Sequence, residues 1–508
     1  MPRALLLAAL LLLPALAGCL GAQPSATPAS GSAACVAGSA ACAIVDGAST
    51  VAPKERQANE LSIAVNPTNP LNVIATGKDY TPDEAGDCTW AGVYATTDGG
   101  KTWKDQNVPG SPWKMRSDPT AAQDRTPFST FWCATDPVVR FGPDGTAYWA
   151  VMPYQCDPAS GSKTGEGTLP QGGLNDFAFT CSAMYILVST DGGLTWPLDK
   201  ARQISTGGYL VHDKEWIAVS QDGNRLVYCW DYQGLGATTP DMMVHAPDPN
   251  ESGVVCSVSK DKANTWSDFA FATAVGGSPE VDFDAKGKAW MVVTGADGHY
   301  VLSSDDGLKW SQPVKAATFK DPSAQNAHGR NVLNGSEFRV SSYGTIAVDR
   351  GNGTHAGRVY VAYFDYSAGN GETMLVWSDD GKTWSQPVRV NDDAGSADQF
   401  LPALSVGPDG TVDVSWQDRR DDPANHLFAT YYAYSLDGGA TFSRNQRVSS
   451  ALSDEQYSHH QNGDVFLGDY RDMGSSRGSA TMVWVDTRNH KADAFVATVP
   501  RPSADAAR

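Results

Sequence analysis

The feature that most constrains this chain is an octapeptide that occurs six times, first as TTDGGKTW at residues 96–103. The other copies are STDGGLTW at 189–196, SKDKANTW at 259–266, SSDDGLKW at 303–310, WSDDGKTW at 377–384 and SLDGGATF at 435–442. Asp can accept hydrogen bonds from the backbone of its own turn, Gly supplies positive φ, and the terminal aromatic ring can be buried between sheets. A catalytic acid is needed once, so the repetition predicts structural turns organised by Asp98, Asp191, Asp261, Asp305, Asp379 and Asp437.

A longer repeat lies upstream of these turns and reads as strand, turn, strand. Its clearest copy is LPALSVGPDGTVDVSWQDRR at 401–420, and the others lie at 61–80, 136–154, 213–232, 278–297, 343–366 and 468–488. Apolar residues alternate with polar ones in each copy, which predicts paired β-strands. The chain therefore contains seven strand units and six octapeptides.

The octapeptide resembles the Asp box, or BNR repeat, of the sialidase superfamily, and the resemblance covers about residues 57–500. In that family the box joins the third and fourth strands of a propeller blade. The resemblance implies an all-β propeller of four-stranded antiparallel blades. Seven units favour seven blades, with six as the alternative. Because a propeller must close its ring, we expect residues 42–50 to supply the strand that the last blade lacks.

The first residues read as a targeting segment. Arg3 precedes an apolar run at 4–13, which is too short to span a bilayer and has the length of a signal peptide core. The following LAGC, ending at Cys19, resembles a bacterial lipobox, which implies cleavage before Cys19 and lipid on its thiol. An ordinary secretory signal is the alternative. We expect a signal peptide at 1–18, a flexible tether at 19–41, the propeller at 42–500 and a tail at 501–508. The protein would then be exported and lipid-anchored at the cell surface or on a membrane facing the periplasm.

Eight cysteines remain after Cys19, and an even number in an exported chain predicts disulfides. Cys229 and Cys256 fall on neighbouring antiparallel strands of the third unit, so we predict that they are bonded. Pairing of nearest neighbours gives three further candidates: Cys35 with Cys42, Cys88 with Cys133, and Cys156 with Cys181.

Charge and composition exclude some partners and cofactors. The net charge of −19 would repel nucleic acid, and no basic run capable of binding phosphates is present. No cofactor is expected. The acidic stretch at 392–398 is a possible Ca²⁺ site without the full EF-hand pattern. HHQNGD at 459–464 favours a polar loop over a metal site. We expect a monomer with a glycan or glycoconjugate ligand.

Polar residues follow the second strand or open the first strand of each unit, on the face opposite the octapeptides. Carboxylates can transfer protons, Tyr can form hydrogen bonds and Arg can bind anions, which together suit a sugar. In sialidases an Asp is the acid/base, a Tyr paired with a Glu is the nucleophile, and three arginines hold the substrate carboxylate. The resemblance places the acid/base at Asp79 by position, and Tyr470 and Glu337 on the rim are the further catalytic candidates. The candidate substrate-binding residues are Arg339, Arg419, Arg488, Asp231, Tyr232 and Asp365. Alternatively, the recurring Asp residues merely cap turns.

One element of the family pattern is missing. The first family arginine belongs to a Phe-Arg-Ile-Pro motif, but Asn59 occupies that position here and Phe400 occupies it in the sixth unit. The sequence therefore favours a sialidase-like glycoside hydrolase acting on extracellular glycans, without the usual arginine motif. The alternative is a propeller that binds glycan or protein without catalysis.

Overall fold

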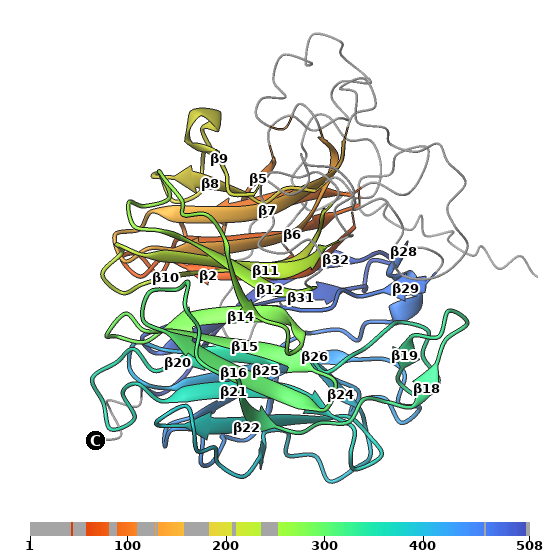
Figure 1. Cartoon of the computed structure of the whole chain (residues 1–508). Helices are drawn as coiled ribbons and strands as arrows, with labels where there is room; N and C mark the ends of the chain where they lie inside the picture. The colour runs from red at the N-terminus through yellow and green to blue at the C-terminus, as the bar shows by residue number, and fades with distance from the viewer. Residues whose placement is uncertain are drawn as a thin grey trace, which may run out of the picture. The chain divides into compact units, whose positions relative to one another are not determined.

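The computed structural model describes residues 42–43, 57–80, 89–108, 128, 131–156, 182–205, 210–234, 252–461 and 464–503. They form seven four-stranded antiparallel sheets arranged as the blades of a β-propeller (Figure 1). The helical segments among them are two short 3₁₀ turns, η4 (Leu198–Lys200) and η6 (Glu455–Tyr457). Within the described ranges no helix is long and apolar enough to span a membrane. The all-β prediction is confirmed, with seven blades rather than six.

Each of the first six blades is one continuous run of four strands, ordered from the inside outwards. Blade 1 contains β2 (Ala58–Val65), β3 (Val73–Asp79), β4 (Trp90–Thr96) and β5 (Lys104–Asn107). Blade 2 contains β6 (Phe131–Phe141), β7 (Ala147–Cys156), β8 (Tyr185–Ser189) and β9 (Arg202–Gln203). Blade 3 contains β10 (Leu210–Val219), β11 (Leu226–Gly234), β12 (Ser252–Ser259) and β13 (Ala270–Thr273).

The same order continues through the second half of the chain. Blade 4 contains β14 (Gly277–Phe283), β15 (Ala289–Gly295), β16 (Gly298–Ser304) and β17 (Val314–Ala317). Blade 5 contains β20 (Thr345–Val348), β21 (Val359–Asp365), β22 (Glu372–Ser378) and β23 (Val388–Arg389). Blade 6 contains β24 (Gln399–Val406), β25 (Val412–Asp418), β26 (Ala429–Ser435) and β27 (Gln446–Arg447).

Blade 7 closes the ring with strands from both parts of the chain. It contains β30 (Met473–Ser476), β31 (Ser479–Asp486) and β32 (Asp493–Pro500), and its outer strand is β1 (Cys42–Ala43). In β1, Cys42 pairs with Val496 and Ala43 with Phe495. The inner strand of each blade packs against that of the next, and β2 of blade 1 packs against β30 of blade 7. The prediction that the segment beginning at residue 42 completes the last blade is confirmed for these two residues; residues 44–50 lie outside the described part.

The inner hairpin of blade 6 shows why the seven strand units fold as they do. Apolar and polar residues alternate along β25, all of them buried, and Gly410 at the preceding turn has φ = 77°, which is accessible to Gly at little cost. The turn is held by a hydrogen bond from Gly410 N–H to the carbonyl of Gly407 (2.9 Å). Thr411 N–H also donates to Asp409 Oδ1 (3.3 Å). Local turn chemistry thus pairs two strands without help from the rest of the chain.

The octapeptides form the turns between the third and fourth strands. In the second copy, Asp191 accepts hydrogen bonds from Ser189 Oγ (2.7 Å), Thr195 N–H (2.9 Å) and Thr195 Oγ1 (2.6 Å). Trp196 at its end packs against Trp149 with ring centroids 5.4 Å apart. The same hydrogen bonds form around Asp98, Asp261 and Asp437. These four aspartates organise turns, as the repetition predicted.

Two octapeptides are offset by one residue from the expected alignment. In the fourth copy the acceptor is Asp306 and not Asp305: it accepts from Ser304 Oγ (3.1 Å) and Lys309 N–H (2.7 Å). In the fifth copy Asp380 accepts from Ser378 Oγ (3.0 Å) and Thr383 N–H (2.8 Å). Asp379 forms an ion pair with Arg358 instead. The assignments of Asp305 and Asp379 are corrected, because the turn requires the acid two residues after the Ser or Thr that ends the strand.

Cross-strand pairing explains the disulfide of blade 3. Cys229 on β11 lies directly opposite Cys256 on β12, with Cα atoms 4.1 Å apart, and the two are bonded. This prediction is confirmed. Cys133 on β6 is also in a disulfide. The sulfur atoms of Cys35, Cys42, Cys88, Cys156 and Cys181, and the whole of Cys19, lie outside the described part of the chain.

The expected tail at 501–508 begins inside the propeller. The side chain of Arg501 is fully buried and forms ion pairs with Asp409 (2.9 Å) and Asp413 (2.7 Å) of blade 6. The end of blade 7 is therefore fastened to its neighbour by charge, and the boundary of the domain lies beyond Arg501.

Candidate active site

The inner strands of five blades share a distortion at the point where they begin. The pairing with the second strand shifts there, and the residue at the shift has positive φ between 48° and 53°: Glu60, Asp136, Lys214, Ser278 and Leu401. A β-bulge of this kind redirects a side chain away from the regular pleat. Because positive φ is strained for residues other than Gly, five such positions around one axis mark this region as a candidate functional site. We call the face on which these strands begin the loop face.

The bulges bring charged residues from blades 1, 2, 3 and 7 together. Glu60 lies 3.4 Å from Lys78 Nζ and 3.8 Å from Lys214 Nζ. Lys214 also pairs with Asp469, which in turn receives two hydrogen bonds from Arg339, at 2.9 and 2.7 Å. We define the central cluster as these residues together with their acidic and aromatic neighbours, Asp136, Asp213, Glu215, Asp231 and Tyr470.

Carboxyl groups outnumber cations in the central cluster, so some of them hold protons at neutral pH. Burial, together with the charge of Asp136, raises the pKa of Glu60 to about 7. Burial raises the pKa of Asp231 to about 7, and burial and Asp136 raise the pKa of Asp213 well above its usual range. Burial alone would raise the pKa of Asp136, but Lys78 and Lys214 hold it below its usual range. The cluster thus contains proton donors beside an ionised carboxylate, the combination that acid/base catalysis uses.

Tyr470 lies at the centre of this arrangement. Its ring packs edge-on against Trp216, with centroids 5.8 Å apart, and Lys214 Nζ lies 5.8 Å from its centroid. Its hydroxyl is buried and forms no hydrogen bond with the described residues. Tyr470 lines a pocket that also includes Lys214, Glu215, Ser278, Tyr343 and Asp469. Burial, then the nearby Asp136 and Glu60, raise its pKa well above the usual range.

Glu215 is the carboxyl group that the structure places with Tyr470. It lines the same pocket and contributes to the field that raises the tyrosine pKa. Both of its carboxyl oxygens are buried without a hydrogen-bond partner among the described residues. Burial and then Asp136 raise the pKa of Glu215 well above its usual range. A carboxyl group of raised pKa holds its proton near neutral pH and is a stronger base in the fraction that is ionised, so Glu215 can accept a proton only in that fraction.

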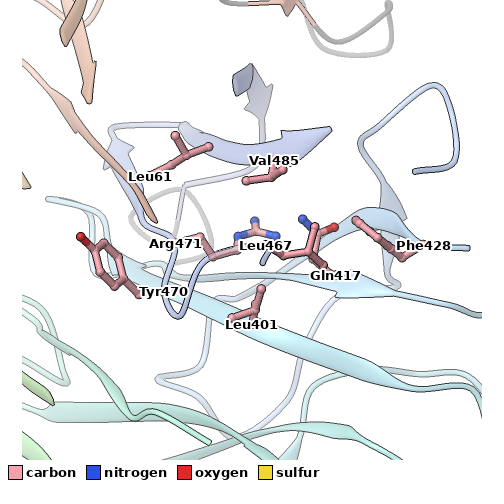
Figure 2. Close-up of a pocket in the computed structure, with 8 residues that line it drawn as sticks. All are labelled: Leu61, Leu401, Gln417, Phe428, Leu467, Tyr470, Arg471 and Val485. Atoms are coloured by element: carbon pink, nitrogen blue, oxygen red, sulfur yellow. The ribbon is translucent and has the colours of Figure 1, made fainter. Parts of the chain in front are cut away.

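Tyr470 also lines a second, smaller pocket. Its lining is drawn in Figure 2, where the guanidinium of Arg471 lies among Leu61, Gln417, Leu467 and Val485. Tyr470 contributes to the lining of both pockets.

The catalytic residues predicted from the sequence separate in space. Tyr470 is in the central cluster. Glu337 is exposed, and its backbone N–H donates to Glu455 Oε1 (2.9 Å). Asp79 ends β3 and is 1 % exposed, opposite Ala58 and Trp90. Lys78 faces Glu60, and side chains alternate along a strand, so Asp79 is directed to the other face of β3. Its role as acid/base stays a prediction.

The candidate binding residues divide in the same way. Arg339 and Asp231 belong to the central cluster, where Asp231 accepts from Ser278 N–H (2.8 Å). Arg419 is fully buried and bonded to Glu455 (2.8 Å), while Tyr232 is buried against Phe269. Neither side chain lies at the surface, where a ligand could reach it without rearrangement.

Asp365 and Arg488 are engaged in local structural contacts: Asp365 caps a turn, and Arg488 is bound to a neighbouring aspartate. Asp365 accepts hydrogen bonds from Lys320 N–H (2.9 Å) and Ser367 Oγ (2.8 Å). Arg488 binds Asp486, which also accepts from Trp484 Nε1 (3.0 Å). Blade 6 repeats this last arrangement with Trp416, Asp418 and Arg420. For these strand-ending aspartates the turn-capping interpretation describes the observed contacts.

Asn59 and Phe400, which stand where the Phe-Arg-Ile-Pro arginine was expected, both have structural contacts. Asn59 is fully buried and donates from Nδ2 to the carbonyl of Phe466 (3.1 Å). Phe400 is buried between Phe338 and Phe428. The central cluster, as defined from the described residues, contains one arginine, Arg339. This arginine is already paired with Asp469.

The two stretches considered for metal binding are engaged in other contacts. In 392–398, Asp392 pairs with Arg420 (2.6 Å) and Asp393 with Arg389 (3.1 Å). In 459–464, His459 stacks on Tyr80 and Asp464 bonds His328 Nδ1 (2.5 Å). This last bond links the hairpin of β28 (His459–Gln461) and β29 (Asp464–Phe466) to that of β18 (Ala324–Gln325) and β19 (Asn331–Val332), and Figure 1 shows both hairpins on the right. The described ranges hold no group of three or more metal-binding side chains.

Sequence analysis missed Glu60, Lys78, Asp136 and Lys214. Three of the five bulges are followed by Pro, at Pro137, Pro279 and Pro402. Within sheets Pro is confined to edges, strand starts and bulges, so its recurrence at the same place in three units was the available signal. It indicates where the bulges lie but not which side chains they bring together.

Comparison with solved structures finds similarity to sialidases and an arabinofuranosidase. A Hadza microbial sialidase matches with a TM-score of 0.43 and 11% identity, covering 81% of this chain and 73% of that one. The intramolecular trans-sialidase of Ruminococcus gnavus matches at 0.42 and 12%, covering 91% and 97%. The GH93 α-L-arabinofuranosidase of Fusarium graminearum also matches at 0.42 and 12%, covering 89% and 96%. No protein-family model and no curated protein match the sequence.

Proposed function

We propose that this protein is an exported, lipid-anchored glycoside hydrolase with a sialidase-like layout that acts on extracellular glycans. The observation that carries the proposal is the position of Tyr470, whose hydroxyl is buried and whose side chain lines a pocket with Glu215 and Glu280, two acids of raised pKa. The octapeptide turns, which we propose are Asp boxes, place this pocket on the opposite face of the propeller.

The chemistry assigned to the pocket uses Tyr470 and Glu215 from its lining, together with Asp231, which accepts a hydrogen bond from the lining residue Ser278. Tyr470 is the nucleophile. Glu215 takes its proton in those molecules in which Glu215 is ionised, because an un-ionised phenol attacks a sugar carbon poorly. The tyrosine oxygen bonds to the sugar carbon as the bond from that carbon to the leaving oxygen breaks. Asp231, with its pKa raised by burial to about 7, protonates the leaving oxygen at neutral pH. Arg339 and Lys214 contribute positive charge that holds Asp469 ionised. Asp79, the acid assigned by family position, is the competing candidate for proton donor.

The test is a panel of aryl glycosides, sialosides included, with the wild type and Tyr470→Phe. The tyrosine hydroxyl forms no hydrogen bond with the described residues, so its removal should leave the melting temperature unchanged. We expect turnover to fall by about 10²-fold or more. The matched control is Tyr363→Phe, a buried tyrosine in the packing between blades 4 and 5, which should keep full turnover. Equal turnover in both variants would remove Tyr470 from the mechanism.

The second candidate function is a propeller that binds glycan or protein without catalysis. The observation that favours it is the ionic network itself: Lys214 and Arg339 are both committed to Asp469, as in a structural cluster. If no glycoside is hydrolysed and a glycan binds with equal affinity to the wild type and to Tyr470→Phe, this second function replaces the first.

A single substitution at Cys19 tests the proposed lipid anchor. Replacing Cys19 with Ser removes the thiol that would carry the lipid, so we expect the variant to leave the membrane fraction. A variant that still sediments with membranes would refute the anchor and leave the hydrolase proposal standing.

A further inference from the structure

Arg471 is a buried cation without a carboxylate partner. Its side chain lines the smaller pocket, between Leu61 of blade 1 and Leu401 and Gln417 of blade 6 (Figure 2). The residue is 4 % exposed. Nη2 donates to Ser415 Oγ (2.5 Å), whereas Nε and Nη1 are buried without a hydrogen-bond partner among the described residues.

The acids adjacent in sequence are bound to other cations. Asp469 binds Arg339 and Lys214, and Asp472 binds Arg140 (2.6 Å). Burial lowers the pKa of Arg471 to about 9, which leaves the guanidinium charged at neutral pH. An ionised side chain removed from water needs a compensating charge.

Other buried arginines of this protein follow that rule. Arg358 pairs with Asp379 (2.7 Å), Arg419 with Glu455 (2.8 Å), and Arg501 with Asp409 (2.9 Å) and Asp413. Arg471 departs from the pattern in a place where a pocket, rather than a carboxylate, adjoins the guanidinium.

The pocket matches a small anion in size and lining. Its space suits about one water-sized particle, too little for a sugar carboxylate with its ring. Gln417 adds an amide: Oε1 accepts from Thr430 Oγ1 (3.1 Å), and the nitrogen is on the side of Arg471 in Figure 2. Leu61, Leu401 and Val485 supply apolar walls, which offer a water molecule no hydrogen-bond partner.

We propose that a single monovalent inorganic anion of the size of chloride binds between Arg471 and Gln417 and completes the packing of blades 1, 6 and 7. The anion compensates the guanidinium that the acids of the central cluster leave unpaired. This site is separate from the catalytic roles proposed for Tyr470, Glu215 and Asp231.

Thermal unfolding of the purified full chain at constant ionic strength tests the site. Chloride replaces gluconate, which is too large for the pocket. Above the dissociation constant we expect the melting temperature to rise by about 2 °C for each tenfold increase in chloride, because a ligand bound only by the folded state stabilises it. Arg471→Met should abolish this rise. The control Arg358→Met removes a paired buried arginine and should keep the rise.

A crystal soaked in bromide provides an independent test. We expect an anomalous peak beside Arg471 Nε, absent in Gln417→Leu crystals or strongly reduced there. Should Arg471→Met fail to fold, this measurement on the wild type still decides the question. Equal melting temperatures in chloride and gluconate, stabilisation by acetate but not by halide, or no bromide peak at Arg471 would each overturn the proposal.

Discussion

At the scale of single residues, burial decides which acid of the loop face can hold a proton. Asp231 and Asp365 occupy corresponding positions at the ends of second strands, in blades 3 and 5. Asp231 lies in the central cluster and has its pKa raised by burial to about 7, whereas Asp365 caps an exposed turn. We expect Asp231→Asn to reduce glycoside turnover by about 10²-fold, as loss of a general acid does, and Asp365→Asn to leave turnover intact.

Turnover of Asp79→Asn, measured together with these two variants, decides whether Asp79 or Asp231 is the proton donor. A larger loss of turnover in Asp79→Asn than in Asp231→Asn would restore the assignment made from family position. Binding of the intact glycan, measured on the same variants, checks that the pocket itself is preserved.

The raised pKa of Asp231 has a consequence for stability. The folded state keeps the proton between about pH 4 and 7 while the unfolded state releases it, so stability from this group is present at low pH and lost as pH rises. Asp231→Asn removes that loss. The stability of the variant relative to wild type should therefore rise by up to about 1.4 kcal/mol per pH unit between pH 5 and 7.

Denaturant unfolding of both proteins across pH 5–8 measures this difference. Burial lowers the pKa values of His212 and His299 to about 3, so these histidines change the stability with pH in the opposite direction. Their contribution is the same in both proteins and cancels in the difference. A difference that stays constant with pH would show that Asp231 is ionised throughout.

At the scale of elements, each octapeptide turn depends on one aspartate. Asp306 accepts hydrogen bonds from Ser304 Oγ, Leu308 N–H and Lys309 N–H. Asp306→Ala should lower the free energy of unfolding by about 1–2 kcal/mol, the scale of a lost turn or helix cap. Asp305→Ala, one residue earlier, should change it by less than about 0.5 kcal/mol. Reversal of the two values would restore the alignment with Asp305.

Asp191 in blade 2 extends this test to function. It organises a turn on the face opposite the central cluster, so Asp191→Ala should lower stability while the activity per folded molecule stays at the wild-type value. A folded variant without turnover would mean that the active site lies on the turn side.

At the scale of the whole molecule, the propeller is held closed at two places in blade 7. One is β1, which pairs with β32, and the other is Arg501, buried between Asp409 and Asp413 of blade 6. Arg501→Ala leaves these two carboxylates buried without their cation, and we expect a loss of about 3–5 kcal/mol. The control Arg447→Ala breaks an exposed pair with Asp421 and should cost less than about 1 kcal/mol. If calorimetry gives equal losses of unfolding free energy for the two variants, the buried Arg501 contact stabilises the fold no more than an exposed ion pair does.

The amino-acid sequence by itself determined the features that depend on neighbours in the chain. Turns, hairpins and the bonded pair Cys229–Cys256 follow from patterns within about thirty residues, and their repetition predicted the propeller. The shift from Asp305 to Asp306 is also determined by the local sequence, because the acid must follow the strand-ending Ser304 by two positions.

Only the tertiary structure decided the composition of the candidate site. Glu60, Asp136 and Lys214 meet because bulges turn them towards one axis, where Lys214 pairs with Asp469, which follows Glu60 in the chain by about four hundred residues. Their pKa values, and the isolation of Arg471, depend on burial and on the sum of surrounding charges. Those quantities belong to three-dimensional distances, which a pattern of alternating residues does not contain.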